Sequence, residues 1–229
     1  MTLNHSIATE VLERFPDYSA IILEVRGLAG GPSDERSEAL LKQAETATLG
    51  LIETTPLDQL PEVLAWRDAY ATFGVKPRVA RSSVEALMRR VETGLPRVDL
   101  LTDIYNAVSV LHRVPIGGEN LDAYSGPAHL VVAIGTEEFE TRNSGEVEIQ
   151  NPDAGEIVWR DDAGVTCRRW NWRQCLRTRL DTQTSNVLFI IDGLGAQGKA
   201  SALAAADRLR VEITSIWSAA EISTQILGS

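Results

Sequence analysis

The chain has 229 residues, 44% of them apolar, and a formal net charge of -10. A globular chain of this length buries about 70% of its unfolded surface, so its core needs no disulfide or metal to support it. The overall acidity argues against indiscriminate nucleic-acid binding, and no apolar run approaches the ~20 residues of a membrane span.

The predicted elements of the N-terminal part are a short helix, a strand and a longer helix. The apolar run AIILEV predicts a strand over Tyr18–Arg26, and a loop is expected from Gly27 to Pro32. Ser33 is the expected N-cap of the next helix. A capping box is not expected there, because Arg36 occupies the third helical position.

Three more helices are predicted before the middle of the chain. The first spans Leu60–Phe73, the second begins at Ser82 or Ser83 and continues through Val91, and the third extends from about Asp99 to His112. Pro115 and Gly117-Gly118 are expected to break the last of them.

The second half of the chain is rich in short β segments. They are HLVVAIG, EVEIQ, EIVWR, VTCRRW and NVLFIID, separated by turn-forming residues, and a final helix is expected after Gly198. Because helices come first and strands later, the order predicts an α+β fold. We expect one compact domain over residues 1–229, with a central β-sheet core and helices packed outside.

Cations and indoles concentrate in one stretch. Residues 159–179 hold six arginines against two aspartates, a local charge of +4, so the rest of the chain carries -14. Three of the five tryptophans lie in the same window. If CRRWNWRQ is a strand, Trp170 and Trp172 point to one side, and Arg169, Asn171 and Arg173 to the other. This stretch predicts either a core face with a solvated face, or a platform for phosphates and bases.

Other chemical motifs have weaker support. GLGAQGK resembles a nucleotide loop in letters, but Ala200 lacks the hydroxyl that would hold magnesium, and the motif also fits a strand-to-helix turn. Cys167 beside two arginines could be a thiolate or a buried strand residue. The cysteine spacing fits no common zinc pattern, so no metal or cofactor is expected. MTLNHSIATE lacks the features of a secretory signal, which predicts a reduced, cytoplasmic, soluble protein.

Two longer segments resemble a known family. They are residues 65–122, containing WRDAY and YNAVSVLHRVPIGGENLD, and residues 155–193, containing CRRWNWRQ and TSNVLF. Together they resemble stand-alone relatives of the B-three/B-four module, the tRNA-binding and editing module of the phenylalanyl-tRNA synthetase β subunit. The similarity covers roughly residues 60–194.

This resemblance implies a function. The family module receives the aminoacylated end of tRNA and hydrolyses tyrosine wrongly attached to the phenylalanine tRNA. By resemblance, the chain is expected to bind aminoacyl-tRNA or a related aminoacyl ester, with the amino acid in a pocket, and to act as a deacylase in trans. No DNA or membrane partner is expected. The alternatives are a non-catalytic tRNA-binding module and a metabolite- or protein-binding domain.

The resemblance also implies site residues. Asn106, the candidate catalytic residue, matches a pocket asparagine, Pro115 matches a proline, and Gly117 stands where the bacterial family has histidine. A pocket glutamate of the family falls near Ile191. The expected substrate-binding residues are Asn106, Pro115, Gly117, Gly118, Arg168, Arg169, Trp170, Asn171, Trp172 and Arg173. The asparagines would bind the ester, the glycines would admit a ligand, the arginines would hold phosphate or carboxylate, and the indoles would stack on a base or enclose a side chain.

Overall fold

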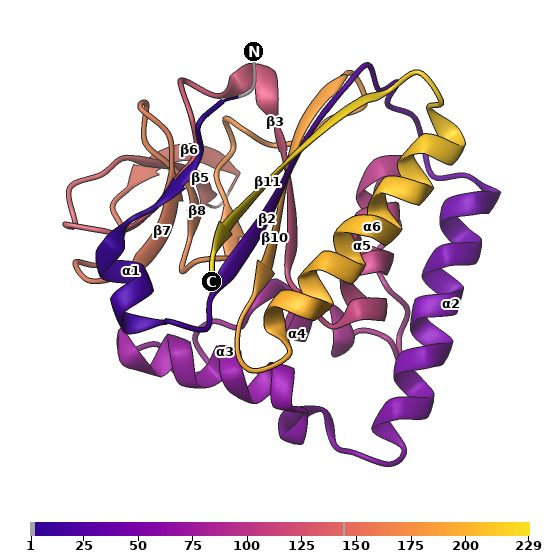
Figure 1. Cartoon of the computed structure of the whole chain (residues 1–229), viewed down its shortest axis with the longest axis horizontal. Coiled ribbons are helices and arrows are strands. Elements are labelled where there is room, and N and C mark those ends of the chain that lie inside the picture. The colour runs from indigo at the N-terminus through magenta and orange to yellow at the C-terminus, as the bar shows by residue number, and fades with distance from the viewer. Residues whose placement is uncertain (1–2, 144) are drawn as a thin grey trace.

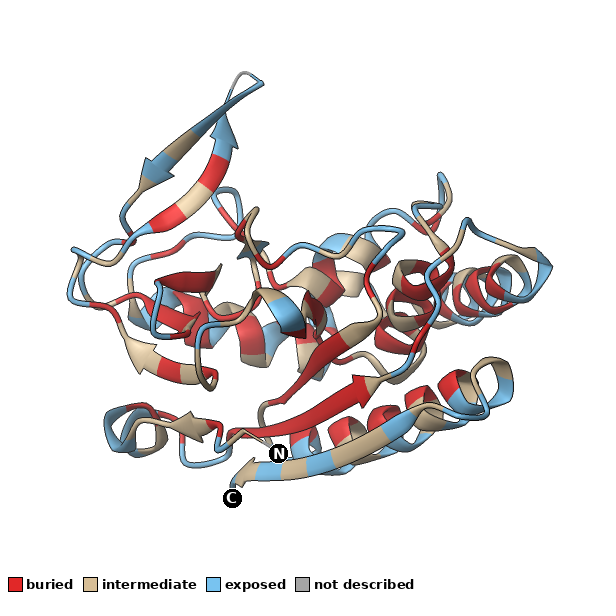
Figure 2. Cartoon of the chain, turned by 90° about the horizontal axis from the view of Figure 1, so that it is seen from above, coloured by how far each residue is buried: buried red, intermediate tan, exposed pale blue. Residues whose placement is uncertain are grey.

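The computed structural model describes residues 3–143 and 145–229 and has a four-stranded antiparallel sheet at its centre. Its strands are β2 (Ser19–Arg26), β3 (Ile116–Asn120), β10 (Asn186–Gly193) and β11 (Glu221–Gly228), in the order β11-β2-β10-β3. Figure 2 shows that the strand leading to the C-terminus is partly exposed along its length, which is expected of an edge strand.

The two central strands are buried on both faces because their apolar residues continue without alternation. In β2, Ile21 and Leu23 contact one core cluster, while Ala20 and Ile22 contact the other. Side chains of successive strand residues point to opposite faces, so a run such as AIILEV requires cover on both sides.

Helices cover one face of this sheet. They are α2 (Glu35–Ile52), α5 (Leu100–His112) and α6 (Gly198–Ile216), and Figure 1 shows all three on the same side. A short helix, α4 (Ser83–Met88), also contributes Val84 and Met88 to this core.

A second sheet and two helices cover the opposite face. The sheet contains β1 (Ser6–Ile7), β4 (His129–Val132), β7 (Ile157–Arg160), β8 (Val165–Arg168) and β9 (Arg173–Gln174), in the order β1-β4-β7-β8-β9. Helices α1 (Thr9–Arg14) and α3 (Pro61–Thr72) flank it, and β5 (Phe139–Asn143) pairs with β6 (Glu146–Gln150) as a separate hairpin (Figure 1). Two short 3-10 helices, Leu57–Gln59 and Leu121–Ala123, complete the described elements.

The predicted α+β class with a β-sheet core and outer helices is confirmed. The helix predicted from about Asp99 to His112 is confirmed as α5, which ends before Pro115, and Gly117 and Gly118 lie beyond it in β3. Two local predictions were wrong. The helix after Gly198 was expected to be the last element, but β11 follows it. Residues 169–172 form a turn between β8 and β9 instead of continuing a strand.

The start of α2 differs from its predicted form. Asp34, not Ser33, is the N-cap: its carboxylate accepts hydrogen bonds from the N–H groups of Arg36 and Ser37, and the Ser37 hydroxyl completes a capping box. The prediction missed this box because serine, rather than glutamate, supplies the reciprocal hydrogen bond.

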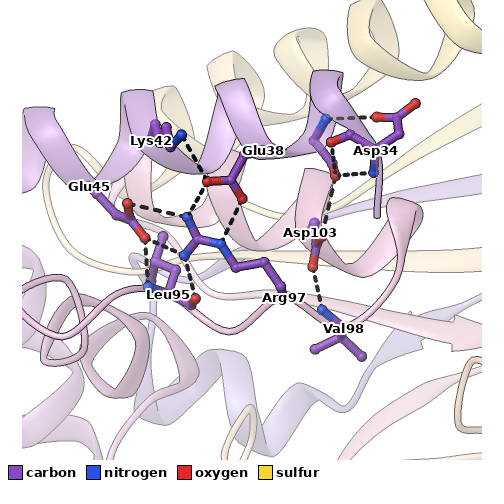
Figure 3. Close-up of polar contacts among 9 residues, drawn as sticks. Asp34, Glu38, Lys42, Glu45, Leu95, Arg97, Val98 and Asp103 are labelled. Atoms are coloured by element: carbon purple, nitrogen blue, oxygen red, sulfur yellow. Dashed lines mark hydrogen bonds and ion pairs between the residues drawn. The ribbon is translucent and has the colours of Figure 1, made fainter. Parts of the chain in front are cut away.

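An arginine attaches the segment before α5 to α2. The Arg97 guanidinium contacts the carboxylates of Glu38 and Glu45, as Figure 3 shows. Its hydrogen bond lowers the pKa of Glu38 to about 2. Asp103 meanwhile accepts hydrogen bonds from the backbone of Val98 and from Ser37. These contacts fix the orientation of α5, which carries Asn106.

Two glycines of GLGAQGK, Gly193 and Gly198, allow the backbone of β10 to lie against the start of α6. A Cβ on Gly193 would lie 2.5 Å from the carbonyl oxygen of Gly198, at the point where β10 turns into α6. The segment therefore has the geometry of a strand-to-helix turn, one of the two structures predicted for GLGAQGK.

Gly193→Ala is expected to lower the free energy of unfolding by about 1–3 kcal/mol, the usual cost of forcing extra volume into a packed region. Gly31→Ala is the matched control, since a Cβ there meets nothing within 4 Å. Urea denaturation measures both, and equal stabilities for the two variants would contradict this account of the turn.

Candidate functional site

A cavity of about 310 Å³ lies between the central sheet, the β8–β9 turn and the helices α4 and α5. Six of the expected site residues line it: Asn106, Gly117, Trp170, Asn171, Trp172 and Arg173. They come from α5, β3, the β8–β9 turn and the start of β9, so residues more than 60 positions apart in the chain share one cavity wall.

The two glycines of β3 point in different directions. A Cβ on Gly117 would meet nothing within 4 Å, so this residue leaves the cavity open. A Cβ on Gly118 would lie 3.0 Å from side-chain atoms of Leu180 and Tyr105, and this residue does not line the cavity. Pro115 also lies outside the lining, where its carbonyl accepts a hydrogen bond from the backbone N–H of Asp192.

The β8–β9 turn depends on two residues in the left-handed region. Arg169 has a φ of 46° and Trp170 a φ of 67°, values that bulky side chains rarely adopt. Backbone hydrogen bonds from Trp170 to Ile157 and from Trp172 to Arg168 hold the turn. The backbone therefore does not alternate here, and Trp170 and Trp172 occupy different environments.

Trp170 is fully buried in an aromatic cluster. Its indole makes edge contacts with Phe15, Tyr18 and Trp66 at ring-centroid distances of 4.8, 4.7 and 5.2 Å. Only part of its surface faces the cavity, so we assign it to the wall of the cavity rather than to a stacking platform.

Arg168 and Arg169 are neutralised within the protein. The guanidinium of Arg168 donates from Nε and Nη2 to Glu156 at 3.0 and 2.8 Å, and both residues are buried. The backbone N–H of Arg169 also donates to Glu156, and Asp153 lies 3.7–3.9 Å from both guanidinium groups. Neither arginine lines the cavity, which corrects their expected role as ligands for an anion.

Trp172 and Arg173 lie at the mouth of the cavity. The guanidinium groups of Arg169 and Arg173 lie 4.3 and 4.5 Å from the centre of the Trp172 ring system. Arg173 is exposed and forms no ion pair with any residue that the structure describes. This cation therefore remains available to a ligand at the mouth.

Asn106 has a free amide in the cavity wall. The residue is only 9% exposed, and its side chain makes no hydrogen bond to the described part of the chain. The amide is not among the fully buried polar groups that lack a partner, so it reaches the open space of the cavity and is accessible to a ligand there. This geometry is consistent with the expected role of Asn106.

The buried carboxyl of Asp192 belongs to a hydrogen-bonded chain that the sequence prediction missed. The Tyr18 hydroxyl donates to its Oδ1 at 2.6 Å and the Asn171 amide to its Oδ2 at 3.1 Å, while Tyr70 donates to Asn171 at 2.9 Å. Burial raises the pKa of Asp192 to about 7, although both hydrogen bonds act in the opposite direction. Asp192 lines the cavity and can therefore gain or lose a proton near neutral pH.

The sequence prediction missed Asp192 because it placed the family's pocket carboxylate one residue earlier in β10. The resemblance placed a pocket carboxylate near Ile191, but Ile191 faces the helical core. Ile190 and Asp192 face the cavity. The alternation in NVLFIID, with Leu188, Ile190 and Asp192 on one side, carried this information.

Burial raises the pKa of two further groups that line the cavity. Burial raises the pKa of Glu119, which accepts hydrogen bonds from Tyr124 and Thr178 at 2.7 and 2.8 Å. Burial also raises the pKa of the Cys167 thiol well above its usual range, and the nearby Glu119 carboxyl adds to the effect. The thiolate interpretation of Cys167 is thus wrong, because its neighbouring arginines point to Glu156 instead.

The buried ion pair between Arg168 and Glu156 predicts that removing the Glu156 charge strongly destabilises the fold. Glu156→Gln should lower the free energy of unfolding by about 3–5 kcal/mol, because it leaves the buried Arg168 without a counter-charge. Asp153→Asn is the control: its side chain is 79% exposed, and its loss should cost no more than about 1 kcal/mol. Similar chemical-denaturation midpoints for the two variants would count against the assignment.

The raised pKa of Asp192 predicts a pH dependence of stability. Between about pH 4 and 7 the folded protein binds a proton that the unfolded chain has released, so stability falls as pH rises through this interval and levels off above pH 7. In Asp192→Asn this component should be absent. Denaturation of both proteins between pH 5.5 and 8 measures it, and parallel curves would refute the raised pKa.

The chain is similar to proteins of one known family. The B3/4 domain family model matches residues 65–210, well over half of the chain. A solved N-terminal fragment of the phenylalanyl-tRNA synthetase β subunit from Pyrococcus horikoshii is similar, with a TM-score of 0.46 and 14% sequence identity. That similarity covers 99% of this chain and 51% of the fragment, so the chain spans about half of the fragment's length. No curated protein matches the chain. The match over residues 65–210, which include the cavity-lining residues, shows that the chain belongs to the B3/4 domain family.

Proposed function

We propose that the cavity binds the aminoacylated end of a tRNA, or a related aminoacyl ester, and that the protein hydrolyses the ester bond. The observation that carries this proposal is that one cavity holds both the Asn106 amide, which makes no hydrogen bond to the residues described, and the buried Asp192 carboxyl, whose pKa is about 7. A volume of about 310 Å³ falls at the lower end of small-molecule sites, so the cavity accommodates a single aminoacyl group.

The proposed reaction needs no protein nucleophile. Ionised Asp192 accepts a proton from a bound water, whose oxygen attacks the ester carbonyl carbon. The Asn106 amide donates a hydrogen bond to the oxygen that becomes negative in the tetrahedral intermediate. Collapse of the intermediate breaks the ester bond, and the ribose oxygen leaves with the proton that Asp192 had accepted, giving free amino acid, uncharged tRNA and ionised Asp192.

The walls of the cavity account for binding of the amino acid. Ile116, Ile190 and the rings of Trp159 and Trp170 enclose an apolar group, while Glu119 and Asn171 offer polar contacts. The mouth carries Trp172 and Arg173, which suit the base and phosphate of a terminal nucleotide.

Deacylation of a panel of mischarged tRNAs tests the proposal. Asp192→Asn should slow the reaction by about 10²–10⁴-fold, the usual contribution of a general base, and Asn106→Ala by about 10²-fold or more. The wild-type rate should rise with pH up to about 7 and then become constant, because Asp192 must be ionised.

Asp207→Asn, on the exposed side of α6, is the matched control and should retain the wild-type rate. Absence of deacylation across the panel would eliminate the hydrolase. Retained binding of an uncleavable aminoacyl-nucleotide analogue would then favour a non-catalytic binding module. A metabolite released from the native protein and identified by mass spectrometry would favour the third alternative.

A further inference from the structure

A second concentration of positive charge lies near the cavity, outside the stretch of residues 159–179. Residues 76–90 contain five cations, Lys76, Arg78, Arg81, Arg89 and Arg90, and only one carboxylate, Glu85. This segment includes α4, whose residues Ser83, Ala86 and Leu87 line the cavity together with Arg90. The segment therefore has a concentrated positive charge at the border of the site, in a chain whose net charge is -10.

Three arginines converge on the single carboxylate of Glu85. Arg67 from α3 donates from Nε and Nη2 at 3.1 and 2.7 Å, Arg89 donates from Nε at 3.0 Å, and the Nε of Arg81 lies 3.4 Å away. Glu85 is buried, but the side chains of the three arginines remain 21–42% exposed. These three guanidinium groups share Glu85 as their ion-pair partner, and Asp58 also interacts electrostatically with Arg67. One carboxylate in contact with three guanidinium groups leaves positive charge at this surface.

Of the remaining cations, Arg90 lies in the cavity lining. Lys76, Arg78 and Arg90 are exposed and form no ion pair within the described residues. Arg89 of the cluster is adjacent in sequence to Arg90, which lines the cavity. A partner that crosses α4 from the Glu85 cluster to the mouth would therefore meet positive charge along its path.

We propose that this surface, defined by Lys76, Arg67, Arg78, Arg81, Arg89 and Arg90, binds the phosphate backbone of the single-stranded 3′ end of a tRNA and directs it into the cavity. Guanidinium groups bind phosphate with paired hydrogen bonds, and a bound phosphate would neutralise the excess charge around Glu85. The proposal rests on the function proposed above for the site, but it concerns binding of RNA rather than hydrolysis.

Binding of uncharged tRNA and of a short oligonucleotide with the tRNA 3′ sequence, measured by fluorescence anisotropy at several salt concentrations, tests the proposal. The double variant Arg78→Ala/Arg90→Ala removes two exposed cations that form no ion pair with the part of the chain that the structure describes, so the fold should be unaffected. We expect about tenfold weaker binding and a shallower salt dependence, with a slope smaller by about 0.7 for each lost phosphate contact on a single strand. Arg89→Gln should weaken binding further while Arg67 still holds Glu85.

Arg36→Ala/Arg208→Ala, in α2 and α6, is the charge-matched control and should bind like the wild type. Equal affinity and equal salt slope for the α4 variant and the wild type would overturn the proposal, as would equal weakening by the control or binding of polyglutamate as tight as that of RNA. Intact RNA binding with no deacylation of any charged tRNA would instead reject the hydrolase and leave this surface assigned.

Discussion

The burial of Trp170 is the interaction on which the site depends. Its indole fills the space between the two sheets, in contact with rings from the N-terminal segment and from α3. Residues with a positive φ that are not glycine cost roughly 1–3 kcal/mol each. Arg169 and Trp170 both adopt this conformation, and the aromatic contacts together with the Arg168–Glu156 pair compensate for its cost.

This turn determines the chemistry of the neighbouring residue. Because Trp170 points into the core, Asn171 reaches Asp192 and Tyr70 and joins two elements through one amide. The same aromatic surroundings keep water away from the Asp192 carboxyl, which raises its pKa to about 7. Packing and acid–base behaviour thus have one cause, and a change that loosens the Trp170 cluster would also alter the protonation of Asp192.

The structure separates two uses of arginine. In the stretch of residues 159–179, Arg168 pairs with the buried carboxylate of Glu156 and Arg177 pairs with Asp161, so these charges stabilise the fold. On α4 and the segment before it, cations outnumber carboxylates and remain exposed, so their charge is available to a partner. An arginine count along the sequence cannot distinguish these situations, because it does not show which carboxylate each arginine contacts: Glu156 pairs with a residue 12 positions away and Arg67 with one 18 positions away.

The sequence by itself determined the α+β class and the apolar strands of the central sheet. Its resemblance to the B3/4 family predicted that Asn106, Gly117 and the 170–173 segment belong to one site. Hydrophobic runs and helix-breaking prolines and glycines are local signals, and the sequence can be read for them for that reason. It did not determine β11, the direction of Trp170 or the pairing of Arg168 and Arg169. Those features depend on residues distant in the chain: β11 pairs with β2 almost 200 residues earlier, and Trp170 contacts Phe15 and Tyr18. The carboxyl that titrates near pH 7 likewise emerged only in the folded protein, because its pKa is set by the surrounding burial and not by its neighbours in sequence.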